Sequence, residues 1–111
     1  MNWIQCLSKS IQYIEEHITD KINIDEISNQ AYTSSSHFQL LFHLVFGMTV
    51  GEYIRNRRLT LAALELLKPG SKIIDVAMRY QYDTQESFSK AFARFHGFPP
   101  SKVQDGKIRI F

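Results

Sequence analysis

The chain has 111 residues, 44% of them hydrophobic and 22% charged, which suits one compact domain or two small lobes and argues against disorder. The single cysteine, Cys6, excludes an internal disulfide and favours a reducing cytoplasm, and the most apolar stretch, residues 38–50, is too short to cross a bilayer. Residues 1–54 carry two basic against six acidic side chains, a net charge of −4, whereas residues 55–111 carry eleven against five, a net charge of +6. This asymmetry fits a polyanionic partner or an ordinary solvated surface.

Two helices are predicted before residue 31. Apolar residues at three- and four-residue intervals predict an amphipathic helix that ends near residues 19–20. These residues are Ile4, Leu7, Ile11, Ile14 and Ile18. A second helix should begin at Asn23, with Glu26 completing a capping box, and reach a turn at residues 31–32.

A third helix should follow three serines at residues 34–36, each of which is able to cap it. We interpret Ser34 as serving in capping alone. Gly47 should end this helix. Its predicted buried stripe is Phe38, Leu41, Phe42 and Val45.

The middle of the chain predicts one long helix, residues 49–67, which opens with a capping box between Thr49 and Glu52 and is broken by Lys68-Pro69-Gly70. Residues 73–80 and then 84–96 should form two more helices, with Asp83 and Glu86 as a cap pair. The predicted core stripe of the later helix is Phe88, Ala91, Phe92 and Phe95. The two prolines at 99–100 permit one more helix start, and residues 107–111 alternate polar and apolar, a weak strand signal.

The two halves of the chain repeat one pattern, at an offset of 49 residues before the turn and 50 after it. The repeated pairs are Ile24 and Ile73, Ile27 and Val76, Phe38 and Phe88, Phe42 and Phe92, and Gly47 and Gly97. Each copy reads as a short helix, a tight turn and a longer helix, which is a helix-turn-helix unit. Two such units fit duplex DNA, whose major groove returns to the same face about every 34 Å. We therefore predict an all-α fold with a first helix-turn-helix subdomain at 1–48, a linker helix at 49–68, a second subdomain at 69–104 and a tail at 105–111.

Several motifs with fixed spacings resemble the AraC/XylS family of bacterial transcription regulators. In the first half they are Phe38-x-x-Leu41-Phe42, Gly47 and Tyr53-Ile54-x-x-Arg57-Arg58-Leu59, and in the second half Ile73-x-Asp75-Val76-Ala77, Tyr80-x-Tyr82-Asp83, Ser87-Phe88-Ser89-Lys90-x-Phe92 and Gly97-Phe98-Pro99-Pro100-Ser101. The similarity covers residues 1–103. It implies seven helices in two lobes, whose third and sixth helices enter successive major grooves, and it implies double-stranded DNA and RNA polymerase as partners.

The resemblance also implies which residues face DNA. In the third helix they are Ser36, His37, Gln39 and Leu40, and in the sixth helix they are Gln85, Glu86, Ser89 and Lys90. Gln can pair with adenine, Lys can donate to guanine and Glu can accept from cytosine, although such polar side chains could also be merely solvated. Arg79 and Arg94, together with Lys72, are candidate contacts to the phosphate backbone, which position a protein without specifying sequence.

Leu40 departs from the family pattern, which commonly has Arg at this position, and Leu44 stands where the family often has a basic residue. A leucine cannot form a hydrogen bond, but it can touch the methyl group of thymine. The two leucines could instead form an apolar patch against another protein. The departure suggests that the sixth helix is the stronger reader of sequence.

Residues 47–55 and the run His37-Phe38-Gln39 are also similar to regulators in which a GyrI-like effector-binding domain follows the DNA-binding part. Residues 107–111 would then begin that domain, and a small-molecule effector is expected only if it exists. A free-standing regulator with a frayed tail is the alternative.

No catalytic or metal-binding pattern accompanies these motifs. The four histidines are scattered without HExxH or CxxC spacing, and no phosphate-binding glycine loop or Gly-x-Ser-x-Gly turn is present. We therefore expect no enzyme activity, no metal, no cofactor and no membrane partner. The alternative function is a small helical protein-interaction module, favoured by Leu40, Leu44 and the acidic N-terminal half.

Overall fold

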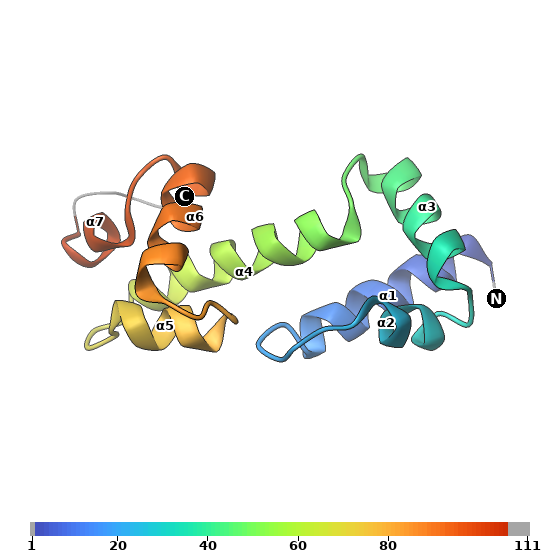
Figure 1. Cartoon of the computed structure of the whole chain (residues 1–111), viewed down its shortest axis with the longest axis horizontal. Coiled ribbons are helices and arrows are strands. Elements are labelled where there is room, and N and C mark those ends of the chain that lie inside the picture. The colour runs from blue at the N-terminus through green and yellow to red at the C-terminus, as the bar shows by residue number, and fades with distance from the viewer. Residues whose placement is uncertain (1, 107–111) are drawn as a thin grey trace. The chain divides into compact units, whose positions relative to one another are not determined.

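The computed structural model describes residues 2–106, and this part of the chain consists of seven α-helices and no strand (Figure 1). The predicted all-α fold is confirmed for these residues, and the weak strand signal at 107–111 lies outside them. The chain divides between Arg55 and Asn56 into two compact units. In chain order the helices are α1 (Trp3–Glu16), α2 (Ile24–Gln30), α3 (Ser35–Phe46), α4 (Val50–Leu66), α5 (Ile73–Arg79), α6 (Gln85–His96) and α7 (Pro100–Gln104).

In the first unit, α2 packs against both α1 and α3. Asn2 caps α1 through a reciprocal capping box with Gln5. The helix ends at Glu16, earlier than predicted, and the backbone N–H of His17, its C-cap, donates to the carbonyls of residues 13 and 14. Ile18 is nevertheless buried, so the apolar periodicity continues into the core after the helical hydrogen bonds have stopped.

Two predicted caps have different partners from those expected. Asn23 caps α2 by accepting from the backbone N–H of Asp25, but Glu26 does not complete the capping box. Its Oε2 accepts instead from the Tyr13 hydroxyl at 3.0 Å, and this hydrogen bond raises the pKa of Tyr13. A contact between two helices has replaced a local one.

The α6 cap is Thr84, and the prediction of an Asp83–Glu86 pair was wrong. The Thr84 hydroxyl accepts from the backbone N–H of Ser87 at 3.0 Å. Ser34 caps α3 in the same way by accepting from His37, as predicted. The two caps are 50 residues apart, whereas Thr33 and Tyr82, whose N–H groups donate to the equivalent carbonyls of Ser28 and Ala77, are 49 apart, so Asp83 is the extra turn residue of the second copy.

Replacing Thr84 with alanine should lower the free energy of unfolding by about 1 kcal/mol, because the N-terminal N–H groups of α6 lose their side-chain acceptor. Asp83→Ala is the matched control and should cost only a few tenths of that amount. Urea denaturation followed by circular dichroism measures both. A larger loss for Asp83→Ala would show that Asp83, not Thr84, caps the helix in solution.

The repeated phenylalanine pairs form the two cores. Phe38 and Phe42 in α3, and Phe88 and Phe92 in α6, are all fully buried. Two stripe positions were predicted wrongly: Val45 is 45% exposed and Phe95 is 42% exposed. Both lie in the last helical turn, just before Gly47 (φ 71°) and Gly97 (φ 86°) redirect the chain through left-handed conformations. The stripe there runs past the part of the helix that the core covers.

The turns inside the two helix-turn-helix units share an unusual backbone feature. Tyr32 (φ 54°) and Gln81 (φ 71°) are the non-glycine residues with positive φ in the described part of the chain, and they lie 49 positions apart. Each follows the C-cap of its first helix, Ala31 or Tyr80. The repeat in the sequence is therefore a repeat in backbone geometry.

Candidate nucleic-acid interface

Helix α3 presents one exposed face opposite its buried phenylalanines. The predicted residues Ser36, His37, Gln39 and Leu40 are all exposed. The Gln39 side chain donates to the Ser35 hydroxyl at 3.2 Å, one turn earlier in the helix. Leu40 is 58% exposed, and Leu44, one turn further on, is 71% exposed. His43 is also exposed but was not among the predicted contacts.

Helix α6 presents a polar and charged face. Gln85, Glu86, Lys90 and Arg94 are exposed, and Ser89 is half-buried. The Lys90 ammonium forms an ion pair with Glu86 at 3.1 Å, across one helical turn. This pair is fully accessible to water and contributes little to stability, so a ligand can compete for either charge.

The two faces differ in charge at equivalent positions. With the offset of 50 that holds after the turn, Leu40 corresponds to Lys90 and Leu44 to Arg94. Helix α3 contains no Lys or Arg. The same surface is therefore apolar on α3 and cationic on α6, although both helices have 12 residues and the same type of cap.

Arg79 is held by other residues of the second unit. Its guanidinium forms an ion pair with Glu65 of α4, and the other carboxylate oxygen of Glu65 accepts from the Tyr80 hydroxyl at 2.9 Å. Arg79 remains half-exposed. It can therefore contact an external anion while it stays paired with Glu65, or it can give up this pair for the anion. Burial, together with the hydrogen bond to Glu65, raises the pKa of Tyr80 to about 12.

The stability of the second unit should therefore fall as the pH rises from about 10 to about 12. Tyr80 loses its proton more readily in the unfolded chain, so its contribution is complete below pH 10 and disappears as the pH passes the folded-state pKa of about 12. The expected loss is about 1–2 kcal/mol, because solvent screens part of the interaction that raises the pKa of Tyr80 above its usual value. Denaturation at several alkaline pH values measures it. Tyr80→Phe should lack this component, and an unchanged pH profile in that variant would contradict the assignment.

Sequence reasoning missed the residue that ties α6 to α4. The His96 ring nitrogen Nε2 lies 2.9 Å from the carbonyl oxygen of Leu59, and the His96 ring lies 4.3 Å from the Phe92 ring, centroid to centroid. This bond joins residues 37 positions apart, so no local pattern could have indicated it. It fixes the C-terminal end of α6, while Gln85, Glu86 and Lys90 in the N-terminal half remain exposed on one face.

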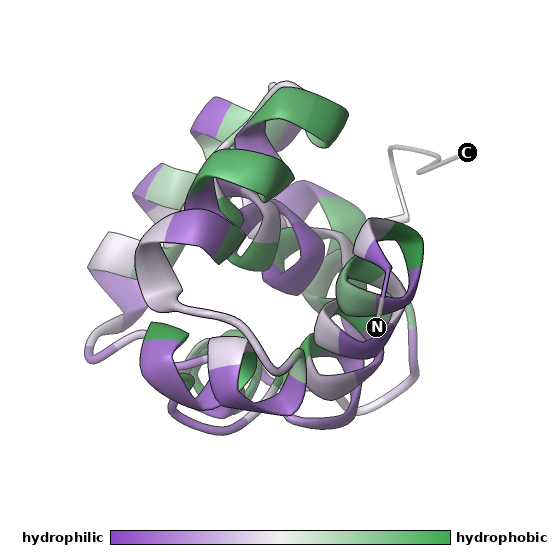
Figure 2. Cartoon of the chain, turned by 90° about the vertical axis from the view of Figure 1, so that its right-hand side faces the viewer, coloured by the Kyte–Doolittle hydropathy of each residue, from purple (hydrophilic) through white to green (hydrophobic). Residues whose placement is uncertain are grey.

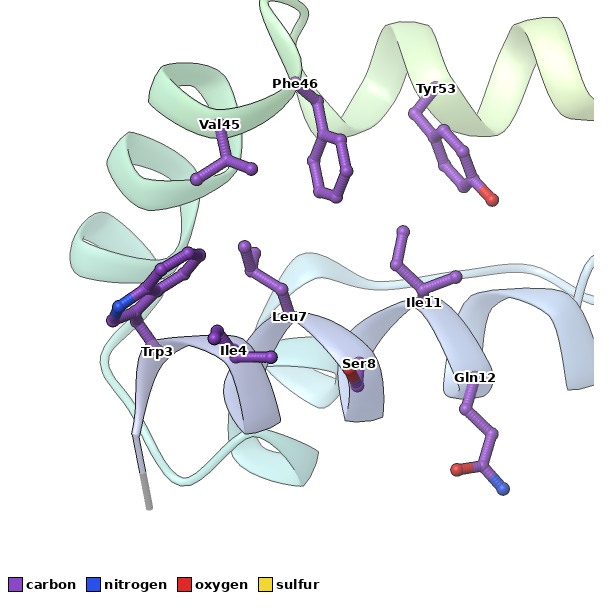
Figure 3. A pocket seen from close by; sticks show the side chains of 9 residues that line it. All are labelled: Trp3, Ile4, Leu7, Ser8, Ile11, Gln12, Val45, Phe46 and Tyr53. Carbon is purple, nitrogen blue, oxygen red and sulfur yellow. The ribbon is translucent and has the colours of Figure 1, made fainter.

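A second surface of the first unit is an apolar groove between α1, the end of α3 and the start of α4, with a volume of about 730 Å³. In Figure 3, side chains from α1 face Val45, Phe46 and Tyr53 across this groove. The Tyr53 hydroxyl donates to Glu15 at 3.1 Å. Val45 is five residues from Leu40, about 140° around the helix. The groove and the exposed face of α3 therefore point in different directions.

No helix within residues 2–106 combines the length and the hydropathy that a membrane span needs. Within the same residues, no cluster of three or more His, Cys, Asp or Glu side chains could hold a metal ion.

The repeated helix-turn-helix pattern is also found in known proteins. A family model described as a helix-turn-helix domain matches residues 27–106. The transcriptional activator AarP of Providencia stuartii is 38% identical over 95 residues, which cover 86% of this chain and 70% of AarP. The regulatory protein SoxS of Salmonella typhimurium is 40% identical over 101 residues, which cover 91% of this chain and 94% of SoxS.

A solved structure has the same fold. It is that of a transcriptional regulator from Chromobacterium violaceum, described as a protein with an AraC-type DNA-binding domain. The two structures align with a TM-score of 0.87 at 17% sequence identity, over 96% of this chain and 95% of the other. At this identity the alignment establishes the fold, and the predicted pair of helix-turn-helix units is confirmed.

Proposed function

The chain belongs to the AraC/XylS family of helix-turn-helix transcription regulators, and from this premise we propose that α3 and α6 enter two successive major grooves of one DNA site. The observation that carries this proposal is the structural repeat. Both helices have the same length, the same type of N-cap and a left-handed glycine at the C-cap. A repeated surface suits a repetitive partner, and duplex DNA is one.

The proposed contacts divide by chemistry. Ser36, His37, Gln39 and Leu40 of α3, and Gln85, Glu86, Ser89 and Lys90 of α6, face base edges. Arg94 lies one turn beyond Lys90 on the exposed side of α6 and contacts phosphate, and Arg79 does so while braced by Glu65. With about six phosphates neutralised, the log of the binding constant should fall with the log of the salt concentration at a slope of about −5.

The proposed compartment is the bacterial cytoplasm, where the protein binds DNA and Cys6 stays reduced. The protein acts by binding, without enzyme activity and without a cofactor. We also retain the division into 1–48, 49–68, 69–104 and 105–111, with a small-molecule effector only if a further domain follows the tail.

RNA polymerase is the proposed protein partner, and the apolar groove on the first unit is its proposed contact surface. The groove exposes Trp3, Ile4 and Phe46, and it points in a different direction from the α3 surface that would be occupied by DNA. Phe46→Ser should reduce transcription in vitro while leaving promoter binding unchanged. Equal transcription by this variant would remove the groove from the polymerase contact.

Selection of bound sites from random duplex DNA, at two salt concentrations, tests the proposed function. Two short motifs about one helical turn apart, roughly 10 base pairs, are the expected result. One motif alone would mean that only one helix reads bases and that the other docks. No enrichment, together with no binding at low salt, would overturn DNA binding and favour the protein-interaction module.

A further inference from the structure

We propose that α3 recognises thymine methyl groups through Leu40 and Leu44, so that the two halves of the DNA site differ in chemistry. This inference rests on the proposed function and names the base that the first unit reads. It assigns α3 to A·T pairs, whereas α6, with its cations, takes guanine and phosphate. The occupant of the apolar face of α3 is thus the floor of a major groove that carries thymine.

Leu40 and Leu44 are both exposed on α3. They lie one helical turn apart on the same face, at 58% and 71% exposure. Helix α3 is capped by Ser34 and anchored by two fully buried phenylalanines, so the leucines are not needed for its core. Figure 2 colours the ribbon by hydropathy, and green, hydrophobic segments make up much of α3.

The side chains around the two leucines suit an A·T pair. Gln39 is exposed beside Leu40, and Ser36 and His43 lie on the same face, but no Lys or Arg is present in α3. A glutamine amide pairs bidentately with adenine, and an apolar side chain contacts the methyl group of the thymine opposite. Guanine is most often read by Arg or Lys, and α3 has neither.

The spacing of the two leucines along α3 matches the spacing of bases along DNA. Four residues along a helix rise about 6 Å. Bases along one DNA strand are about 3.4 Å apart, so two leucines on one face match methyl groups about two base steps apart. At the equivalent positions of α6, Lys90 and Arg94 offer charges with the same separation. One scaffold thus presents two readers of opposite chemistry.

The test replaces thymine with deoxyuridine, which removes the methyl group and leaves base pairing unchanged. The probe is a synthetic duplex of the site obtained by selection with the wild-type protein, with deoxyuridine placed in one half-site at a time. Each methyl group buried against leucine should be worth about fourfold in affinity, so substitution in the α3 half-site should weaken binding about fourfold to fifteenfold. The same substitution in the α6 half-site should have a much smaller effect.

The variants separate contact from folding. Leu40→Ala with Leu44→Ala should bind the thymine and deoxyuridine duplexes equally, while Leu64→Ala, an exposed leucine of α4, should behave as wild type. Selection with Leu40→Arg should recover guanine in the α3 half-site. Circular dichroism checks that each variant is folded.

The outcomes distinguish this inference from the proposed function. Specific DNA binding that is indifferent to the thymine methyl groups, or unchanged by the double alanine variant, would overturn methyl recognition and leave the DNA-binding function intact. In that case the leucines belong to a protein-contact surface. Absence of any DNA binding would overturn both.

Discussion

Replacing Phe92 with alanine should lower the free energy of unfolding of the second unit by about 3–5 kcal/mol. Phe92 is fully buried, and its ring lies 5.6 Å from that of Phe88, 4.3 Å from His96 and 6.1 Å from Phe98, measured between centroids. Truncation therefore leaves a cavity among three rings and loosens the His96 bond that ties α6 to α4. A unit that unfolds would also withdraw Lys90 and Arg94 from DNA.

Urea denaturation can assign this loss to one unit, because the single tryptophan, Trp3, lies in the first unit. Circular dichroism should show an early transition for Phe92→Ala, while the Trp3 fluorescence transition should move much less. The control is Phe95→Ala, in the same helix but 42% exposed, which should cost less than about 1.5 kcal/mol. Equal losses for the two variants would contradict the assignment of the core.

Replacing Lys90 with alanine should weaken binding to the selected DNA site by about 5- to 100-fold, the range for one good contact to a base. Binding to random DNA should weaken much less, by the loss of one cation. The exposure of Lys90 and its accessible ion pair with Glu86 make its ammonium available to DNA, because such a pair is weak in water.

Lys9→Ala is the matched control, because it removes the same charge from an exposed position on α1 of the other unit. It should change the two affinities by the same small factor. Affinity measured at several salt concentrations separates the contributions, since loss of a phosphate contact lowers the salt slope by about 1, whereas loss of a base contact changes specificity. Equal losses on selected and random DNA for Lys90→Ala would refute base reading by this residue.

Local patterns were sufficient for most of the fold. The spacing of Phe38 and Phe42, with a serine cap before them and Gly47 after them, predicts α3. The same pattern of apolar spacing, N-cap and C-terminal glycine predicts α6. The capping box of Thr49 and Glu52 is present at the start of α4, as predicted. These predictions succeed because each depends on groups within about four residues of one another, where backbone geometry alone determines the contact.

Two of the errors come from the packing of other elements, and the error at the α6 cap comes from the inserted turn residue. Glu26 was assigned to a cap, but the Tyr13 hydroxyl, 13 positions away, takes its carboxylate. Phe95 was assigned to the core on periodicity, but periodicity does not show where neighbouring elements stop covering a helix. At the α6 cap, Asp83 and Thr84 are both good capping residues, and the inserted residue of the turn decides between them.

The sequence by itself therefore determined the all-α repeat, the positions of the two exposed helices and the family, since periodicity, caps and fixed spacings are all local features. Only the tertiary structure decided which charges are free and which are held. Arg79 and Lys90 are both basic residues of the second helix-turn-helix unit, yet Arg79 is held by Glu65, 14 positions away, while Lys90 pairs with Glu86, an exposed neighbour on its own helix. The physical reason is that ion pairs and apolar grooves depend on the close approach of distant segments, which packing creates.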